Sequence, residues 1–236
     1  MSDRRLPSKS KRTDVDSFLK KVAALPPRSN HGDAGRLLFA LDATASRERT
    51  WDRACNIQAQ MFEECTALGG LELQLCYYRG FREFKHTRWL RDSTALASHM
   101  VKVTCAAGIT QVERVLKHAE REAAAKKIDA MVYVGDCMEE DIDIVCHVAG
   151  KLGLRSVPAF MFQEGNDPIA KRAYEEIARL TGGAYCQFDG SSAQQLRDLL
   201  SAVAVFASGG RRALEDFGRR RGGIVPRLTN QMNPRK

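Results

Sequence analysis

Long apolar segments are missing from this chain of 236 residues. It has no run of about 18 apolar residues, the length that a membrane-spanning helix needs, so we expect no such span. The N-terminus, MSDRRLPSKSKRTDVD, is basic but no apolar stretch follows it. A secretory signal requires that stretch, and we therefore predict a cytoplasmic protein.

Cysteine motifs are also missing, although cysteine itself is not rare. The seven cysteines are odd in number and scattered, with no CxxC pair and no Cys/His cluster at zinc-ligand spacing. Most lie within apolar runs, as buried free thiols do. This pattern argues against a disulfide framework and favours a reducing compartment. The seven are Cys55, Cys65, Cys76, Cys105, Cys137, Cys146 and Cys186.

The motifs of several enzyme classes are absent as well. There is no glycine-rich phosphate loop of the P-loop or dinucleotide-binding type. Cys137 follows a predicted strand, but no histidine is placed beside it by sequence, and a lone cysteine there is typically inert. We expect His147 to pack within a helix and the other histidines to lie in loops or on helix surfaces. Those are His31, His86, His99 and His118.

Charge is concentrated at the two ends of the chain. The net charge is +8, but residues 1–21 carry seven Lys or Arg against three Asp, and residues 211–236 carry eight against two acidic residues. The part between them is slightly acidic. Basic tails can attract nucleic acid or acidic surfaces weakly, through Arg219, Arg220 and Arg221, or they can simply solubilise the protein. No aromatic stacking platform or known fold module accompanies the arginines to give specificity. Binding of nucleic acid or an acidic surface through the basic tails is the alternative interpretation.

The central part of the chain alternates apolar runs with helical patterns. This alternation predicts an α/β fold: a doubly wound, mostly parallel sheet with helices on both faces. A hairpin after the second strand supplies one antiparallel edge strand. The proline in the strand at 155–162 suggests an edge position or an irregularity. Strands are predicted at 36–41, 71–78, 129–135, 155–162 and 184–188, and helices at 47–67, 92–105, 110–127, 139–152, 167–181 and 191–206.

Three parts of the chain follow from these patterns. Residues 1–35 are predicted to be a basic, largely disordered segment, apart from one short helix at 14–25 that carries Phe18 and Val22 on one face. Residues 36–207 form the predicted domain. Residues 208–236 contain glycine pairs and an arginine run, and we expect a flexible basic tail.

Oxygen-bearing side chains follow two of the predicted strands and precede one helix. Asp42, Thr44 and Ser46 come after the first strand, Thr110 opens the helix at 110–127, and Asp136 follows the strand at 129–135. Ligands of open parallel sheets bind at the carboxyl ends of the strands, where these residues are expected to meet. Carboxylate and hydroxyl oxygens suit a hard cation such as Mg²⁺.

Here the chain resembles the von Willebrand factor A (VWA) family, whose metal-ion-dependent adhesion site combines Asp-x-Ser-x-Ser after the first strand with a later Thr and Asp. The matching segments are LDATAS, GITQVERVLKHA and MVYVGDCMEED, and TGGAYCQF at 181–188 is similar to the family's Gly-Gly turn into a late strand. Thr44 stands where Ser is usual, and Cys137 where Gly is common. The resemblance covers about residues 36–207.

The resemblance implies that the chain binds a partner protein rather than acting as an enzyme. Mg²⁺ or Mn²⁺ would be held by Asp42, Thr44, Ser46, Thr110 and Asp136, and an Asp or Glu of the partner would complete the metal shell. The hydroxyls would bind the metal directly and the two carboxylates partly through water.

Alternatives to a metal site remain open for the same residues. Ser46 could cap the helix at 47–67, with Asp42 accepting backbone N–H bonds. The acidic residues at 139–141 are read as the first turn of a helix, where carboxylates are favourable. A phosphotransferase of the haloacid dehalogenase type also uses an Asp after its first strand, but it needs a second Asp two residues later, where this chain has Thr44.

Overall fold

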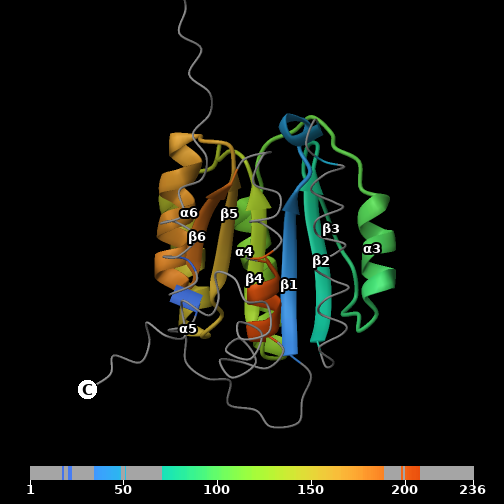
Figure 1. Cartoon of the computed structure of the whole chain (residues 1–236). Coiled ribbons are helices and arrows are strands. Elements are labelled where there is room, and N and C mark those ends of the chain that lie inside the picture. Colours follow the sequence, from blue (N-terminus) through green and yellow to red (C-terminus); the bar gives the residue numbers. More distant parts are fainter. Residues whose placement is uncertain are drawn as a thin grey trace, which may run out of the picture.

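The computed structural model describes residues 18, 21–22, 35–48, 51, 71–188, 198 and 200–207. Within these ranges, strands and helices alternate in the order that the sequence predicts (Figure 1). Nearly all of the predicted segments 1–35 and 208–236 lies outside the described residues. So does most of the predicted helix at 47–67, of which a 3₁₀ turn, η1 (Ala45–Arg47), and the helical residues Glu48 and Trp51 are described.

The strands form a single six-stranded sheet. They are β1 (Gly35–Asp42), β2 (Leu71–Arg79), β3 (Glu83–His86), β4 (Ala130–Gly135), β5 (Ala159–Glu164) and β6 (Ala184–Phe188). Their spatial order is β3-β2-β1-β4-β5-β6 (Figure 1). Within this sheet β3 pairs antiparallel with β2, and the other neighbours are parallel. The chain therefore winds outward in both directions from β1 and β4, which confirms the doubly wound fold with one antiparallel edge strand.

Helices cover both faces of the sheet. One face packs on α4 (Val112–Ala125), α5 (Ile142–Leu154) and α6 (Pro168–Thr181). The other packs on α3 (Ser93–Val101) and the helical residues 200–207. Every residue of β1 is buried, because both of its faces are covered.

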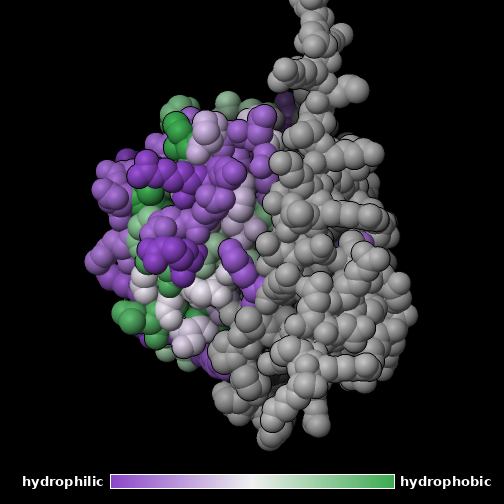
Figure 2. All heavy atoms as spheres, turned by 60° about the vertical axis from the view of Figure 1, so that its left-hand side comes forward, coloured by the Kyte–Doolittle hydropathy of each residue, from purple (hydrophilic) through white to green (hydrophobic). Residues whose placement is uncertain are grey.

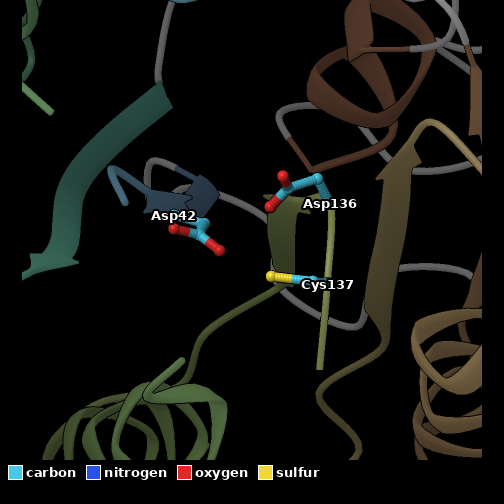
Figure 3. A group of neighbouring side chains, drawn as sticks. All are labelled: Asp42, Asp136 and Cys137. Atoms are coloured by element: carbon cyan, nitrogen blue, oxygen red, sulfur yellow. The ribbon is translucent and has the colours of Figure 1, made fainter. Parts of the chain in front are cut away.

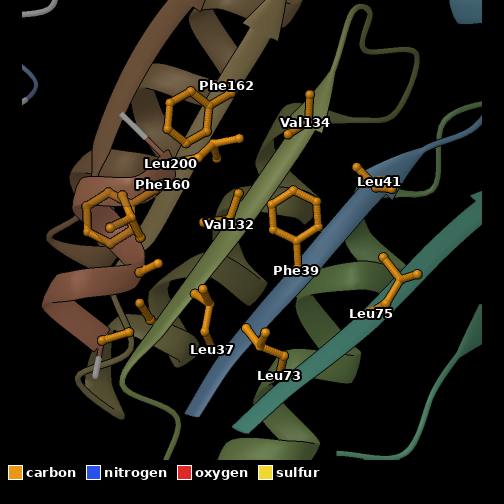
Figure 4. Close-up of a cluster of buried hydrophobic side chains, with 14 of the residues drawn as sticks. Leu37, Phe39, Leu41, Leu73, Leu75, Val132, Val134, Phe160, Phe162 and Leu200 are labelled. Carbon is orange, nitrogen blue, oxygen red and sulfur yellow. The ribbon is translucent and has the colours of Figure 1, made fainter. Parts of the chain in front are cut away.

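The second of these apolar layers also takes in Phe18 and Val22, from the predicted short helix. Side chains of neighbouring strands meet there, with Leu37 and Phe39 among those labelled in Figure 4. The Phe18 ring lies 5.2 Å from that of Phe162, centre to centre.

The position of β5 corrects one prediction. The strand at 155–162 was expected at an edge or with an irregularity, but β5 lies between β4 and β6. Pro158 precedes the first residue of the strand, and its carbonyl accepts the N–H of Met131 at 2.9 Å. The missing N–H of proline therefore falls outside the ladder, and the edge prediction was wrong.

The helix-covered side formed by α5 and α6 is mostly hydrophilic at its surface (Figure 2). The exposed large apolar residues on these helices are Ile144, Leu154 and Ile169. Among the described helices, none has the length and apolar character to cross a membrane.

Two histidines differ from their predicted places. His147 is exposed rather than packed. His118, expected on a helix surface, is 3% exposed and its Nε2 lies 2.9 Å from Gln74 Oε1. Its ring lies 4.5 Å from that of His86 and 5.3 Å from that of Phe84. Burial, together with the neighbouring His86, lowers the pKa of His118 to about 4.

We expect His118 to make the protein less stable as the pH falls from 6.5 through about 4. In that interval the unfolded chain binds a proton at His118 and the folded chain does not, so the free energy of unfolding rises with pH. Urea unfolding at several pH values should show a smaller slope in this interval for His118→Gln than for the wild type. His147→Gln is the matched control, and an unchanged slope in His118→Gln would contradict the assignment.

Candidate functional site

Two aspartates meet where neighbouring strands end. Asp42 is the last residue of β1, and Asp136 directly follows β4. These strands are adjacent and parallel, with Leu41 paired to Val134, so their carboxyl ends open at the same edge of the sheet. Ligand atoms of Asp42, Asp136 and Cys137 all lie within 4.8 Å of one another (Figure 3). The predicted meeting of the two carboxylates is therefore present in the structure.

The carboxylate oxygens of this pair are incompletely satisfied. Asp42 is fully buried; its Oδ1 accepts the N–H of Thr44 at 2.8 Å. Within the described part of the chain, neither Asp42 Oδ2 nor Asp136 Oδ1 has a hydrogen-bond partner, although both atoms are buried. A buried carboxylate oxygen without a partner is costly, so such a pair favours a bound proton or a bound cation.

The electrostatics of Asp42 point the same way. Burial raises the pKa of its carboxyl above 3.8, and the nearby Asp136 adds to the rise, against the opposing effects of Thr44 and Arg47. A divalent cation beside Asp42 would offset the cost of burying its negative charge.

Thr44 and Ser46 lie in the same turn as Asp42. Thr44 is buried and Ser46 exposed, and their hydroxyl oxygens are 3.0 Å apart. Ser46 lies inside η1 rather than before it; the cap position falls to Thr44, which makes no side-chain capping bond. The bond from Thr44 to Asp42 leaves the second carboxylate oxygen unbound, so local capping explains only part of the arrangement.

Thr110 is buried two residues before the start of α4, and its contacts differ from those of the other predicted residues. Its hydroxyl accepts the N–H of Glu139 at 3.0 Å, and its own N–H donates to the Glu139 carboxylate at 3.0 Å. Burial raises the pKa of the neighbouring Glu140, and the N–H groups of Glu113 and Val112, together with Thr110, oppose that rise. The structure thus ties Thr110 to the loop that carries Asp136, rather than to Asp136 itself.

The prediction that Glu139 and Glu140 form the first turn of a helix was wrong. Helix α5 begins at Ile142, and Asp141 caps it by accepting the N–H of Asp143. Glu140 instead reaches across to the start of α4, where its carboxylate accepts the N–H groups of Val112 and Glu113. Since Gln111, the cap residue of α4, makes no side-chain capping bond, Glu140 caps that helix from a distant loop.

Glu140→Ala is therefore expected to lower the free energy of unfolding by about 1–2 kcal/mol, the typical loss for a helix cap. Urea unfolding measures this. The exposed Glu175→Ala on α6 is the matched control and should change stability by less than about 0.5 kcal/mol. Equal losses in the two variants would mean that the capping bonds contribute little.

Arg47 is a functional candidate that the sequence interpretation did not include. It is fully buried, and its Nη1 donates to the carbonyls of Asp42, at 2.8 Å, and Val134, at 3.3 Å. Its Nε pairs with Glu164 at 3.1 Å. Burial would lower its pKa, but Glu164, Asp42 and Asp136 raise it, so the guanidinium stays charged. The Arg47 guanidinium lies over the ring of Trp51. The two residues are four apart in the sequence, a helical spacing that could have indicated this contact.

A chain of buried tyrosines supports the loop after β4. Tyr78 and Tyr133 hydroxyls are 2.7 Å apart, and those of Tyr133 and Tyr174 are 3.2 Å apart. Tyr174 then donates to the carbonyl of Cys137 at 2.6 Å. Burial raises the pKa of all three hydroxyls, so they remain protonated and can hold the Asp136–Cys137 turn in place.

Several solved structures share this fold. A von Willebrand factor type A protein from Catenulispora acidiphila aligns with a TM-score of 0.60 at 14% identity, over 73% of this chain and 43% of that chain. The SpRpn10 VWA domain gives 0.58 at 13% identity, over 71% and 94% of the two chains. The pilus adhesin SpaC from Lactobacillus rhamnosus GG gives 0.61 at 8% identity, over 82% and 31%.

These structural alignments show the fold alone, which is that of a VWA domain. The chain spans less than half of the Catenulispora acidiphila chain that it resembles. No protein-family model matches the sequence, and no curated protein sequence matches it.

Proposed function

We propose that this protein is a metal-dependent protein-interaction module. The observation that carries the proposal is the pair of buried carboxylate oxygens, Asp42 Oδ2 and Asp136 Oδ1, which have no hydrogen-bond partner among the described residues and come from adjacent strand ends. A site for a divalent cation explains why two acids are kept together in a buried place.

The residues present fit a cation of the Mg²⁺ or Mn²⁺ class. Asp42 and Asp136 would hold it with the hydroxyls of Thr44, Ser46 and Thr110, which are the hard oxygen ligands that such ions take. When bound, the cation supplies an open coordination position for an acidic residue of a partner. Thr44 and Ser46 already lie beside Asp42, whereas the Thr110 hydroxyl would also keep its bond to the N–H of Glu139.

The fold supports a binding role. One structural neighbour is a pilus adhesin and another is a minor pilin from Streptococcus sanguinis. By analogy with these adhesion and pilus proteins, we propose that this chain binds a protein, through an Asp or Glu of that partner. A charge-assisted contact to a bound metal would then depend on both the metal and the partner's acid.

A catalytic role is less well supported. Asp42 lacks the second acid of a haloacid dehalogenase, because the position two residues later is Thr44. Burial and Asp136 raise the pKa of Cys137 to about 12, which keeps its thiol protonated and a poor nucleophile at neutral pH in the metal-free protein. The alternative use of basic tails in nucleic-acid binding concerns residues outside those that the structure describes.

A selection with displayed random peptides tests the proposed interaction. Peptides would be captured by the full-length protein in Mg²⁺ and eluted with EDTA. We expect the eluted peptides to share an Asp or Glu whose replacement by Ala or by the matching amide abolishes binding, and we expect no capture by Asp42→Ala. Binding that persists in EDTA, or peptides without a required acid, would contradict the mechanism.

A further inference from the structure

Cys137 adds a sulfur atom to the aspartate pair. The thiol belongs to the same three-residue cluster as Asp42 and Asp136, with their ligand atoms within 4.8 Å of one another, and Figure 3 shows it beside both carboxylates. Cys137 is only partly buried, so the cluster is open to solvent on one side. The sulfur is a ligand type that an all-oxygen magnesium site does not have.

Two features hold the backbone that carries this thiol. The carbonyl of Cys137 accepts the Tyr174 hydroxyl at 2.6 Å, and the adjacent Asp136 follows β4 directly. The fully buried Asp42, with its unpartnered Oδ2, faces the thiol from the end of β1 (Figure 3). A sulfur beside an unsatisfied buried carboxylate is an arrangement that points to a shared ligand.

The ligand set resembles a catalytic-type zinc shell in its number and kind of donors. Zinc takes Cys sulfur at about 2.3 Å and carboxylate oxygen at about 2.0–2.2 Å, and an open zinc site has three protein ligands and one free position. Donor atoms around one tetrahedral ion lie about 3.5 Å apart by this geometry, so a bound ion would draw these ligand atoms, now within 4.8 Å of one another, closer together. Thiolate ligands favour zinc and similar ions over magnesium.

We propose that Asp42, Asp136 and Cys137 bind a thiophilic divalent cation, Zn²⁺ or its spectroscopic substitute Co²⁺, more tightly than Mg²⁺. The inference rests on the proposed function in one respect, that this acid pair holds a divalent cation. Binding replaces the S–H proton of Cys137 by an S–metal bond and releases that proton to solvent. The fourth position remains open for the acidic residue of a partner.

Cobalt absorption tests the proposal directly. The full-length protein would be stripped with EDTA, which is then removed, reduced with a phosphine and titrated with Co²⁺. We expect a sulfur-to-cobalt charge-transfer band in the near ultraviolet for the wild type and for Cys146→Ser, whose thiol lies on α5 outside the cluster. The band should be absent in Cys137→Ser and in Asp42→Ala, and Zn²⁺ should remove it from the wild type.

Competition with a chelator of known affinity measures how much each substitution weakens Zn²⁺ binding. The affinity for Zn²⁺ should fall by at least about 100-fold in Cys137→Ser, because loss of an outer-shell partner alone costs about 10–100-fold and Cys137 is proposed to bind the metal directly. The rise in melting temperature caused by Mg²⁺ should persist. Cys137→Ala serves as a second variant, and circular dichroism of each metal-free variant shows that it folds.

The outcomes separate this inference from the proposed function. If Mg²⁺ or Mn²⁺ stabilises the wild type but no band forms with Co²⁺, the site is an oxygen site and the thiol does not bind. A band that survives in Cys137→Ser would assign the sulfur to another cysteine and overturn the inference. If none of the four metals changes the melting temperature, the metal-binding function itself is wrong.

Discussion

Asp42→Asn is expected to make the metal-free protein more stable near neutral pH and to remove its response to Mg²⁺ or Mn²⁺. Asparagine keeps the Oδ1 that accepts the Thr44 N–H. It removes the buried charge and turns an N–H group towards the acid pair, where Asp136 Oδ1 has no partner among the described residues. Relief of one or two unsatisfied buried groups is worth about 1–3 kcal/mol.

The raised pKa of Asp42 also predicts how the free energy of unfolding changes with pH. Because the pKa of Asp42 is raised in the folded protein, the folded state holds a proton that the unfolded state releases above pH 3.8. The free energy of unfolding in EDTA therefore falls as the pH rises from 3.8 to the raised pKa, by up to about 1.4 kcal/mol per pH unit. This slope is opposite to that of His118, and Asp42→Asn should lack it.

The metal response is the larger effect to measure. A cation present at about 100 times its dissociation constant stabilises the folded state by about 2.7 kcal/mol, which unfolding in EDTA and in excess metal will resolve for the wild type. Asp143→Asn, an exposed acid on α5, is the matched control and should respond as the wild type does. A full response in Asp42→Asn would place the cation elsewhere.

Periodicity was sufficient to predict the architecture, because buried parallel strands and amphipathic helices have distinct patterns. The strand at 184–188 and the antiparallel return after β2 are both confirmed. The Gly-Gly turn before β6 is also explained by the structure. Gly182 adopts a left-handed conformation with φ of 70°, and a Cβ at Gly183 would lie 2.0 Å from the Ala159 carbonyl oxygen.

Contacts between distant segments could not be predicted in this way. Glu140 was assigned to the helix that follows it, but its hydrogen bonds go to α4, 27 and 28 residues earlier. His118 was assigned to a loop or a helix surface, and nothing in the sequence indicated that Gln74, on a buried strand, would face it. Sequence placed Asp42 and Asp136 together only because parallel strand ends share one edge.

Arg47→Met is expected to be among the most destabilising single substitutions, with a loss of about 3–5 kcal/mol in the free energy of unfolding. The guanidinium is fully buried and bonds to two carbonyls and to Glu164, whose side chain is 12% exposed. Its removal leaves the Glu164 charge and two carbonyls without that donor. Urea unfolding of the metal-free proteins measures the loss.

The matched control is Arg155→Met, which breaks an ion pair of similar length with Glu120 at the surface. Exposed pairs contribute about 0–1 kcal/mol, so this variant should remain close to the wild type. The double variant Arg47→Met with Glu164→Gln should recover part of the loss, since no buried charge is then left unpaired. Losses of equal size in Arg47→Met and Arg155→Met would show that the buried ion pair contributes no more to the free energy of unfolding than the exposed one.

The same substitution separates the structural role of Arg47 from its electrostatic role at the site. Its charge lies close enough to Asp42 and Asp136 for both to raise its pKa, so it already neutralises part of the charge that would attract a cation. If Arg47 only stabilises the fold, Arg47→Met should bind Mg²⁺ as the wild type does or more weakly. If it also competes with the cation, the folded variant should gain more stability from Mg²⁺ than the wild type. We expect the second result, because removing a fixed positive charge beside a divalent site strengthens its attraction for metal.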